Sequence, residues 1–344
     1  MEKYGYRFSF GPWNIHEGAD PFGPPVRPSR SFDDKLGVYR ELGFDAVQFH
    51  DDDAVPELDR LSPAQIASEA QTMARKLADN GLVAEFVAPR LWEHPDTVDG
   101  AFTANDAQVR AYAIDRVKKT ADIGRELGTS LMVLWLAREG TYLREAKDAV
   151  RATGQLLEAI NTVLEYDPEL RIAVEPKPNE PMDLAYIPTM GHGLALGMAS
   201  ADPDRVGVLM ESAHAILAGL DPADEISFAM AFDKLWSVHL NDQNGLKFDQ
   251  DRSFGAVDLR RAFNQVRVLD DNRFWEIGMV GLDVKAMRTQ PAELATKHLR
   301  NSLSTFLRLV ELVRTLDRQM MDDLIAARDY EELDWLIVNT LLGK

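Results

Sequence analysis

Eight short apolar runs, separated by polar links and by segments of helical periodicity, recur along the chain of 344 residues. They predict strands because they are rich in β-branched and aromatic residues. They lie at 7–10, 45–49, 82–87, 131–136, 171–175, 206–211, 235–240 and 274–278. Eight alternating strand and helix units favour an α/β fold of the (β/α)8 TIM barrel type, in which the chemistry lies at the carboxyl ends of the strands.

The segments between the runs favour this barrel over a doubly wound sheet. Residues 63–80 and 105–127 have helical periodicity, and the first of them begins with a proline and ends just before Gly81. A doubly wound sheet would require a glycine-rich phosphate turn after the first strand, and GPWN at 11–14 is not such a turn.

Further helical sequence follows the eighth unit. Five apolar residues fall at helical spacing there, namely Leu303, Phe306, Leu307, Val310 and Val313. Residues 319–344 form a second helical stretch. We therefore expect a catalytic barrel over 1–300 and a C-terminal helical extension over 301–344 that packs on a neighbouring subunit.

The composition of the chain limits the kinds of partner and metal ligand that it can be expected to have. A formal charge of -18 repels phosphate backbones and anionic lipids, so nucleic acid and membrane partners are not expected. No apolar stretch approaches the roughly 18 residues of a membrane span, and the N-terminus lacks the pattern of a secretory signal, which predicts a cytoplasmic protein. Because the chain has no cysteine, any metal must be bound by carboxylates or histidine.

Acidic and imidazole side chains gather at the ends of the later predicted strands. They are Glu175, Glu211, His214, His239, Asp249, Asp251 and Asp283. In a barrel these ends meet at one rim, where like charges about 4 Å apart repel by several kcal/mol unless cations lie between them. Alone, an acidic loop pair is usually solvated and a histidine after a strand is usually hydrogen-bonded. The prediction of a metal site therefore depends on the clustering.

The spacing divides these residues into two ligand groups. Asp249 and Asp251 can reach one ion from a tight loop, together with His214 and Glu211, and Glu211 can bridge to a second ion. The second group is Glu175, His239 and Asp283, which come from separate strands. Oxygen ligands suit Mg²⁺ or Mn²⁺, and imidazole ligands shift the preference toward Mn²⁺ or Co²⁺.

Other side chains at the rim are candidates for catalysis and for substrate binding. His50 and Asp53 in FHDDD form a candidate proton-transfer pair, whereas Asp51 and Asp52 are equally consistent with an acidic helix N-terminus. Lys177 is predicted to lie in the same space as Glu175. Trp13, Trp92 and Trp135 follow the first, third and fourth strands, where they form either plain barrel core or an apolar wall for a sugar.

Several of these residues belong to motifs that span nearly the whole chain. The motifs are DPFG at 20–23, FHDDD at 49–53, FTAND at 102–106, REG at 138–140, EPKPNEP at 175–181, QNG at 243–245, KFDQD at 247–251 and LLG at 341–343. In these motifs the chain resembles the xylose isomerase family, whose members are two-metal aldose–ketose isomerases built on a TIM barrel.

The resemblance implies roles for the site residues. Glu175, Glu211 and Asp283 correspond to ligands of a structural metal. Glu211, His214, Asp249 and Asp251 correspond to ligands of a catalytic metal. Lys177 corresponds to the residue that binds the substrate carbonyl oxygen, and His50, supported by Asp53, to the residue that opens the cyclic sugar. Trp13 and Trp135 correspond to the aromatic walls, and Trp92 stands where the family commonly has a phenylalanine. Phe22 corresponds to a residue that reaches a neighbouring subunit's pocket, and Glu180 to an acid beside the ligands.

The chain also departs from the family pattern. His239 stands where the family has a metal-binding aspartate, and Leu209 where an asparagine is usual. Ala88 and Arg90 replace small polar residues beside the substrate. A histidine on the seventh strand is similar to related single-metal sugar epimerases and C-glycoside deglycosidases.

Together these features predict a sugar isomerase that transfers a hydride between C1 and C2 of an open-chain sugar, assisted by two divalent cations (Mg, Mn or Co) and needing no organic cofactor. The alternative is an epimerase or a lyase that acts on a keto sugar with the same metal site. A third hypothesis, a non-enzymatic sugar-binding barrel, is supported by His239 and Leu209. By resemblance, the chain is expected to form a homodimer or homotetramer.

Overall fold

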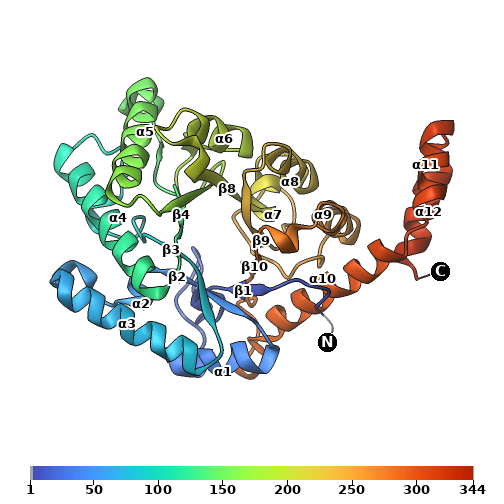
Figure 1. Ribbon diagram of the computed structural model, residues 1–344, viewed down its shortest axis with the longest axis horizontal. Helices are drawn as coiled ribbons and strands as arrows, with labels where there is room; N and C mark the ends of the chain where they lie inside the picture. Colours follow the sequence, from blue (N-terminus) through green and yellow to red (C-terminus); the bar gives the residue numbers. More distant parts are fainter. Residues whose placement is uncertain (1–2, 344) are drawn as a thin grey trace.

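A closed parallel barrel forms the centre of the molecule (Figure 1). The computed structural model describes residues 3–343, and over them eight strands close in the order β1-β10-β9-β8-β6-β4-β3-β2. The strands are β1 (Phe8–Phe10), β2 (Ala46–His50), β3 (Val83–Ala88), β4 (Leu131–Trp135), β6 (Arg171–Glu175), β8 (Val206–Glu211), β9 (Leu235–Leu240) and β10 (Val280–Leu282). The predicted TIM barrel is confirmed. A separate antiparallel pair joins β5 (Gly140–Thr141) to β7 (Leu184–Ala185).

Helices surround the barrel and bury one face against it. They are α1 (Phe32–Leu42), α3 (Pro63–Asp79), α4 (Ala107–Leu127), α5 (Ala149–Tyr166), α6 (Met190–Met198), α8 (Pro222–Ala231), α9 (Leu259–Asp271) and α10 (Lys297–Thr315). Local sequence sets their ends. Ser62 and Gln65 form a reciprocal capping box at the start of α3, and Asp106 caps α4. Two short helices, α2 (Asp51–Ala54) and α7 (Ser212–Leu217), follow β2 and β8 directly and carry site residues.

The position of the eighth strand was predicted wrongly. Residues 274–278 were expected to be extended, but Phe274–Glu276 is a 3-10 helix and the strand lies later, at Val280–Leu282. Phe274 and Trp275 pack against residues from other parts of the chain, and strand propensity does not take such contacts into account. Phe274 is fully buried, and the ring of Trp275 packs edge-on against Tyr6 with centroids 5.4 Å apart.

The C-terminal extension begins within a barrel helix. Helix α10 continues without interruption through residue 301, where the extension was expected to begin. The five apolar residues that fall at helical spacing in the sequence are all buried. Residues 319–344 were expected to form one helical stretch. The structure instead has two helices, α11 (Arg318–Ala327) and α12 (Tyr330–Leu341), because Arg328 adopts a left-handed conformation with φ 56°.

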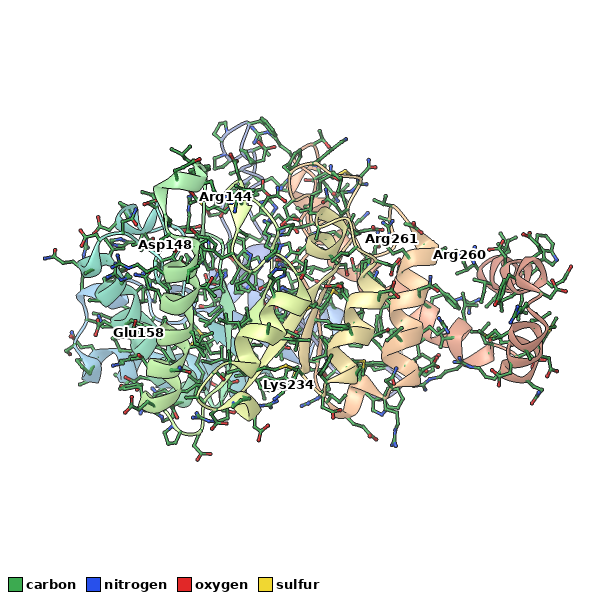
Figure 2. The ribbon with its side chains drawn as sticks, turned by 90° about the horizontal axis from the view of Figure 1, so that it is seen from above. Arg144, Asp148, Glu158, Lys234, Arg260 and Arg261 are labelled. Carbon is green, nitrogen blue, oxygen red and sulfur yellow. The ribbon has the colours of Figure 1, made fainter. Side chains whose placement is uncertain are left out.

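Helices α11 and α12 project from one side of the barrel in both views (Figures 1 and 2). Arg260 of α9, labelled in Figure 2, bonds Asp334 of α12 at 2.5 Å. Within residues 3–343, each helix is too short or too polar to cross a lipid bilayer.

A buried ion pair joins α2 to α4 beneath the rim of the barrel. Asp51 is fully buried and receives two hydrogen bonds of 2.8 Å from Arg116, together with one of 3.0 Å from the Thr120 hydroxyl. This arrangement anchors the turn that carries His50 and Asp53. Removing one partner of a buried pair leaves an uncompensated charge, which is strongly destabilising.

We therefore expect Arg116→Met to lower the free energy of unfolding by about 3–5 kcal/mol, measured by urea denaturation. Arg60→Met is the matched control. Arg60 also bonds a carboxylate, that of Glu57 at 3.1 Å, but its side chain is 79% exposed. The control should change stability by less than about 0.5 kcal/mol. Equal losses in the two variants would contradict the role of the buried pair.

Candidate metal centre and active site

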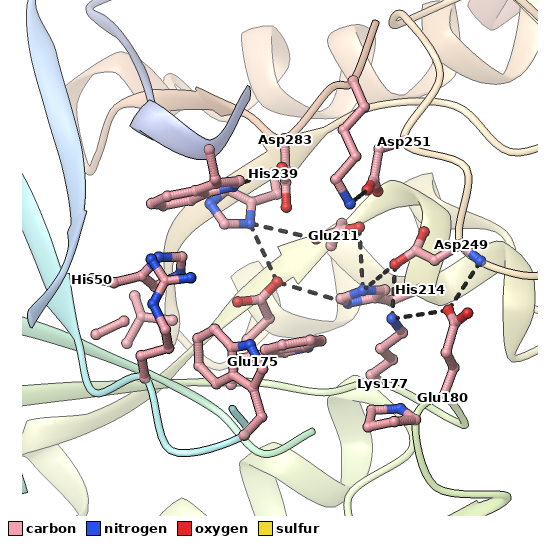
Figure 3. Close-up of a pocket in the computed structure, with 18 of the residues that line it drawn as sticks. His50, Glu175, Lys177, Glu180, Glu211, His214, His239, Asp249, Asp251 and Asp283 are labelled. Atoms are coloured by element: carbon pink, nitrogen blue, oxygen red, sulfur yellow. Dashed lines mark hydrogen bonds and ion pairs between the residues drawn. The ribbon is translucent and has the colours of Figure 1, made fainter. Parts of the chain in front are cut away.

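A cavity of about 350 Å³ opens at the carboxyl ends of the strands (Figure 3). It brings together twelve of the fourteen site residues predicted from the sequence, and only Asp53 and Phe22 are not among its lining. The twelve are Trp13, His50, Trp92, Trp135, Glu175, Lys177, Glu211, His214, His239, Asp249, Asp251 and Asp283. The expected convergence of the strand ends is therefore observed.

Glu211 lies at the centre of the candidate metal ligands. It belongs to three sets of residues whose ligand atoms lie within 4.8 Å of one another, and the other members of these sets are Glu175 with His214, His239 with Asp283, and Asp249 with Asp251. The fold explains this position. Glu211 is the last residue of β8, and α7 begins at once, so that His214 lies one helical turn beyond it.

The two histidines link these carboxylates. Nε2 of His214 lies 3.2 Å from both Glu211 Oε1 and Asp249 Oδ2. Nδ1 of His239 lies 3.2 Å from Glu175 Oε1 and 3.4 Å from Glu211 Oε2 (Figure 3). His214 also contacts Glu175 through Nδ1 at 3.7 Å, so His239 contacts two carboxylates and His214 three.

The pKa shifts of the acidic residues reflect their burial and their closeness to one another. Burial raises the pKa of Glu211 to about 7, against the opposing effect of His214. Burial raises the pKa of Asp251 well above its ordinary value, and the neighbouring Asp249 carboxylate adds to the shift. Burial acts in the same direction on Asp249, but the positive charges of Lys177, His214 and Lys285 together outweigh it and hold the pKa of Asp249 well below its usual range. The acids thus lack sufficient positive charge to be ionised together.

The donor atoms fit divalent cations. Among the described residues, Glu211 Oε2, His214 Nδ1 and Asp249 Oδ1 are buried without a hydrogen bond, although the first two have longer ion-pair contacts with His239 and Glu175. Buried polar atoms in folded proteins are normally paired, so three unpaired ones in one cavity indicate a missing partner. Carboxylate oxygens combined with imidazole nitrogen suit Mg²⁺, Mn²⁺ or Co²⁺.

Lys177 extends into the cavity beside these acids. Its Nζ lies 2.8 Å from Asp249 Oδ2 and 3.3 Å from Glu180 Oε2, and it lies 5.1 Å from the centroid of the Trp135 ring. Burial favours the neutral amine, but the Asp249 carboxylate outweighs it and raises the pKa of Lys177. Lys177 is therefore a cation at physiological pH.

His50 and Asp53 form the predicted pair. Nδ1 of His50 lies 3.1 Å from Asp53 Oδ2. Burial acts to raise the pKa of Asp53, but the hydrogen bond and the charge of His50 lower it below its ordinary value. The acidic run also begins α2, so its two interpretations are compatible: Asp53 holds His50, and Asp51 binds Arg116.

The three tryptophans form one wall of the cavity. Trp13 stacks on His50 with ring centroids 4.1 Å apart and donates to Asp283 Oδ1 at 2.9 Å. Trp92 contacts His50 at 5.0 Å and Trp135 edge-on at 4.5 Å. Phe22, in contrast, is 79% exposed and packs against Phe248.

Four polar residues of the site were not predicted. Asn241 bonds Glu211 and Asp251, and Lys285 pairs with Asp251. Each follows a predicted ligand by two residues, so the two-residue period of an extended chain could have indicated them. Gln48 and Glu85 lie within β2 and β3, and their sequence offers no comparable signal.

Comparison with known proteins agrees with the barrel fold. A family profile described as xylose isomerase-like TIM barrel matches residues 36–302. A xylose isomerase domain protein from Alicyclobacillus acidocaldarius is 17% identical with a TM-score of 0.62, covering 90% of this chain and 99% of its own.

Two other solved structures are similar to the same degree. An IolI protein with a bound zinc atom is 16% identical with a TM-score of 0.62, covering 88% of this chain and 98% of its own. D-psicose 3-epimerase from Clostridium cellulolyticum H10 is 13% identical with a TM-score of 0.60, covering 89% of this chain and 99% of its own. At these identities the likeness establishes the fold.

The raised pKa of Glu211 generates a test of metal binding. A carboxyl group whose folded pKa rises from 4.5 to about 7 stabilises the metal-free protein below its ordinary pKa, and this contribution is lost as the pH rises through about 7. A bound cation replaces the proton. We expect Mn²⁺ to raise the melting temperature more at about pH 7.5 than at about pH 5.5.

Two variants complete this test. Glu211→Gln should abolish the effect of Mn²⁺ on the melting temperature. Glu93→Gln should retain it, because Glu93 lines the same cavity but belongs to none of the ligand sets. A response to Mn²⁺ that is independent of pH, or that survives in Glu211→Gln, would contradict the assignment.

Proposed function

Because the chain belongs to the xylose isomerase-like TIM barrel family, we propose that it is a metal-dependent aldose–ketose isomerase. One observation carries the proposal. Glu211 is common to three ligand sets and thus suited to bridge two cations, and the ammonium of Lys177 lies beside one of these sets. This combination of two cation positions and a fixed cation can stabilise negative charge on two adjacent sugar oxygens.

The residues divide between the two cations. As the sequence predicts, Glu175, His239 and Asp283 would hold one, and His214, Asp249 and Asp251 the other, with Glu211 shared between them. The ligand atoms of Glu175 and His214 also lie within 4.8 Å of each other, so the two positions adjoin. When bound, the cations would act as Lewis acids that polarise O1 and O2 of the open-chain sugar. Mg²⁺, Mn²⁺ and Co²⁺ all suit this donor set.

His50 is positioned to open the cyclic sugar. Its Nδ1 is held by Asp53 at 3.1 Å, which leaves Nε2 as the nitrogen available to the substrate. Stacking on Trp13 keeps the imidazole ring in this orientation. A histidine oriented in this way can move a proton between the ring oxygen and O1 near neutral pH.

The rearrangement itself transfers hydrogen between neighbouring carbons. The O2–H proton leaves, hydrogen moves from C2 to C1 with its electron pair, C2 becomes the carbonyl carbon, and O1 takes up a proton. The ammonium of Lys177 compensates the negative charge that develops on O1. The tryptophan wall excludes water from the migrating hydrogen.

A second candidate is an epimerase or a lyase that acts on a keto sugar. His239 favours it, since its imidazole stands where a two-metal isomerase would have an aspartate, and D-psicose 3-epimerase has the same fold. In that reaction His50 would remove a proton from carbon. The carboxylates near Lys177 are less available for this step, because Asp249 belongs to a ligand set and Glu180 binds Lys177 and the Asp249 amide.

Deuterium incorporation from D₂O into the product distinguishes the two reactions. A panel of aldoses, ketoses and keto-glycosides is incubated with the enzyme and Mn²⁺ in D₂O and followed by NMR. We expect an aldose to be converted to a ketose with little deuterium on carbon, because a hydride shift retains the substrate hydrogen. Deuterium incorporation at the reacting carbon would instead support the second candidate.

Within the same assay, Lys177→Met should lower kcat by about 10²- to 10³-fold, as expected for loss of one group that stabilises developing charge. Lys247→Met is the control, since Lys247 is exposed and lies outside the cavity lining. Normal turnover by Lys177→Met would refute its role.

We also propose that the extension formed by α11 and α12 contacts a second copy of the chain, giving a homodimer or homotetramer. Large apolar side chains on these helices are exposed: Ile325 is 48%, Tyr330 60% and Trp335 56% exposed. Exposed apolar side chains that cluster on one projecting element are typical of protein interfaces.

We expect a molar mass of two or four chains by light scattering for the native protein, and a smaller mass for the double variant Ile325→Ser and Trp335→Ser. Val150→Ser is the control, because Val150 is 84% exposed on α5, away from the extension. A monomeric native protein would contradict the proposal.

A further inference from the structure

A β-bulge in the barrel wall lies next to the candidate metal centre. Val47 of β2 pairs with Ala84 of β3, whereas Phe49 pairs with Val87. One residue of β2, Gln48, therefore lies opposite two residues of β3. Bulges of this kind turn a side chain away from its regular alternation and are common beside active sites.

The bulge delivers two adjacent side chains of β3 to the same region. Glu85 contacts Gln48, and the ring of the next residue, Phe86, lies 5.9 Å from the ring of His239. In a regular strand, neighbouring side chains point to opposite faces. The extra residue is the reason that both reach the interior.

Glu85 is an unusual residue for the inside of a barrel, which is normally filled by branched apolar side chains. Its carboxylate accepts hydrogen bonds from the hydroxyl of Ser237 at 2.7 Å, from the hydroxyl of Ser9 and from Nε2 of Gln48 at 3.1 Å. Three donors occupy most of the acceptor sites of this carboxylate and fix its orientation.

Glu85 determines the orientation of the Gln48 amide. The amide nitrogen donates to Glu85 Oε2 and to Ser9 Oγ, each at 3.1 Å. The opposite orientation would place the amide oxygen against a carboxylate oxygen, with no hydrogen between them. The amide oxygen of Gln48 therefore faces Nε2 of His239, at 3.2 Å.

Gly281 leaves the space that this contact needs. A Cβ atom at position 281 would lie 2.3 Å from Nε2 of Gln48 and 3.2 Å from Cδ2 of His239. A side chain at this position of β10 would therefore displace the amide from the imidazole.

An amide oxygen only accepts hydrogen bonds, so the Nε2 atom of His239 that faces it must carry hydrogen. In the neutral imidazole, Nδ1 then has the free lone pair, and this atom points toward Glu175 and Glu211. We propose that Glu85 and Gln48 are positioning residues that hold His239 as the Nε2–H tautomer and thereby present Nδ1 as a metal ligand. This inference rests on the metal site of the proposed function.

Binding of Co²⁺ alone to the full chain tests this inference, by calorimetry and by the visible absorption of the bound ion. Loss of a group that orients a histidine ligand typically weakens metal binding by about 10- to 100-fold. We expect Gln48→Met to show such a loss at one site together with an altered Co²⁺ spectrum. Glu85→Gln should weaken Co²⁺ binding and alter the Co²⁺ spectrum to a smaller extent, because the new amide oxygen can still accept a hydrogen bond from Gln48.

Ser237→Ala is the matched control. It removes a buried hydroxyl that donates to the same carboxylate but has no bond to Gln48. We expect a change in Co²⁺ affinity of less than about threefold, well below the loss expected when an orienting group is removed. Wild-type affinity and spectrum in Gln48→Met would overturn the inference while leaving the metal site intact. Failure of the unmodified protein to bind Co²⁺ would overturn the metal site and the inference together.

A second measurement reports the tautomer of His239 directly. Long-range ¹H–¹⁵N NMR of the Zn²⁺-loaded protein reports which nitrogen of each histidine ring carries hydrogen, and the signal of His239 is identified by its loss in His239→Asn. We expect hydrogen on Nε2. Hydrogen on Nδ1 would overturn the proposed tautomer.

Discussion

Mutual repulsion between buried carboxylates is the constraint on which this site depends. Glu211 is 1% exposed and lies among Glu175, Asp249, Asp251 and Asp283, all brought to it by neighbouring strand ends or by the loops that follow them. Removing such groups from water is costly unless positive charge or hydrogen-bond donors accompany them. The nearby imidazoles, the ammonium groups of the site and the cations that we propose each supply positive charge or hydrogen-bond donors to these carboxylates.

The same constraint explains why the cavity suits chemistry on a sugar. A region that stabilises several anionic oxygens in a fixed arrangement also stabilises negative charge that develops on a substrate, without reorganisation during the reaction. Lys177 and His50 lie on different sides of the acids (Figure 3). Trp13 links His50 to these acids, because it stacks on the imidazole and donates a hydrogen bond to Asp283. In the reaction that we propose, charge stabilisation, proton transfer and exclusion of water would therefore act on one small volume.

His239 shows how a single replacement changes this balance. Where the xylose isomerase pattern has an aspartate, an imidazole contacts both Glu175 and Glu211 and removes one negative charge from the cluster. A nitrogen ligand must be oriented by its second nitrogen, whereas a carboxylate can bind through either oxygen. The bulge that brings Glu85 to Gln48 provides that orientation, so the departure from the family pattern and the irregular strand are physically linked.

The barrel and the clustering of charged residues at its rim could be predicted from the sequence alone, because the carboxyl ends of parallel strands share one rim and any charged residue placed there meets the others. Glu175, Glu211 and His239 could thus be identified without coordinates. Only the tertiary structure decided that Phe274 belongs to a buried turn rather than a strand, and that Glu85 reaches Gln48. Both depend on contacts between distant segments and on a local shift of strand pairing, which neither periodicity nor propensity encodes.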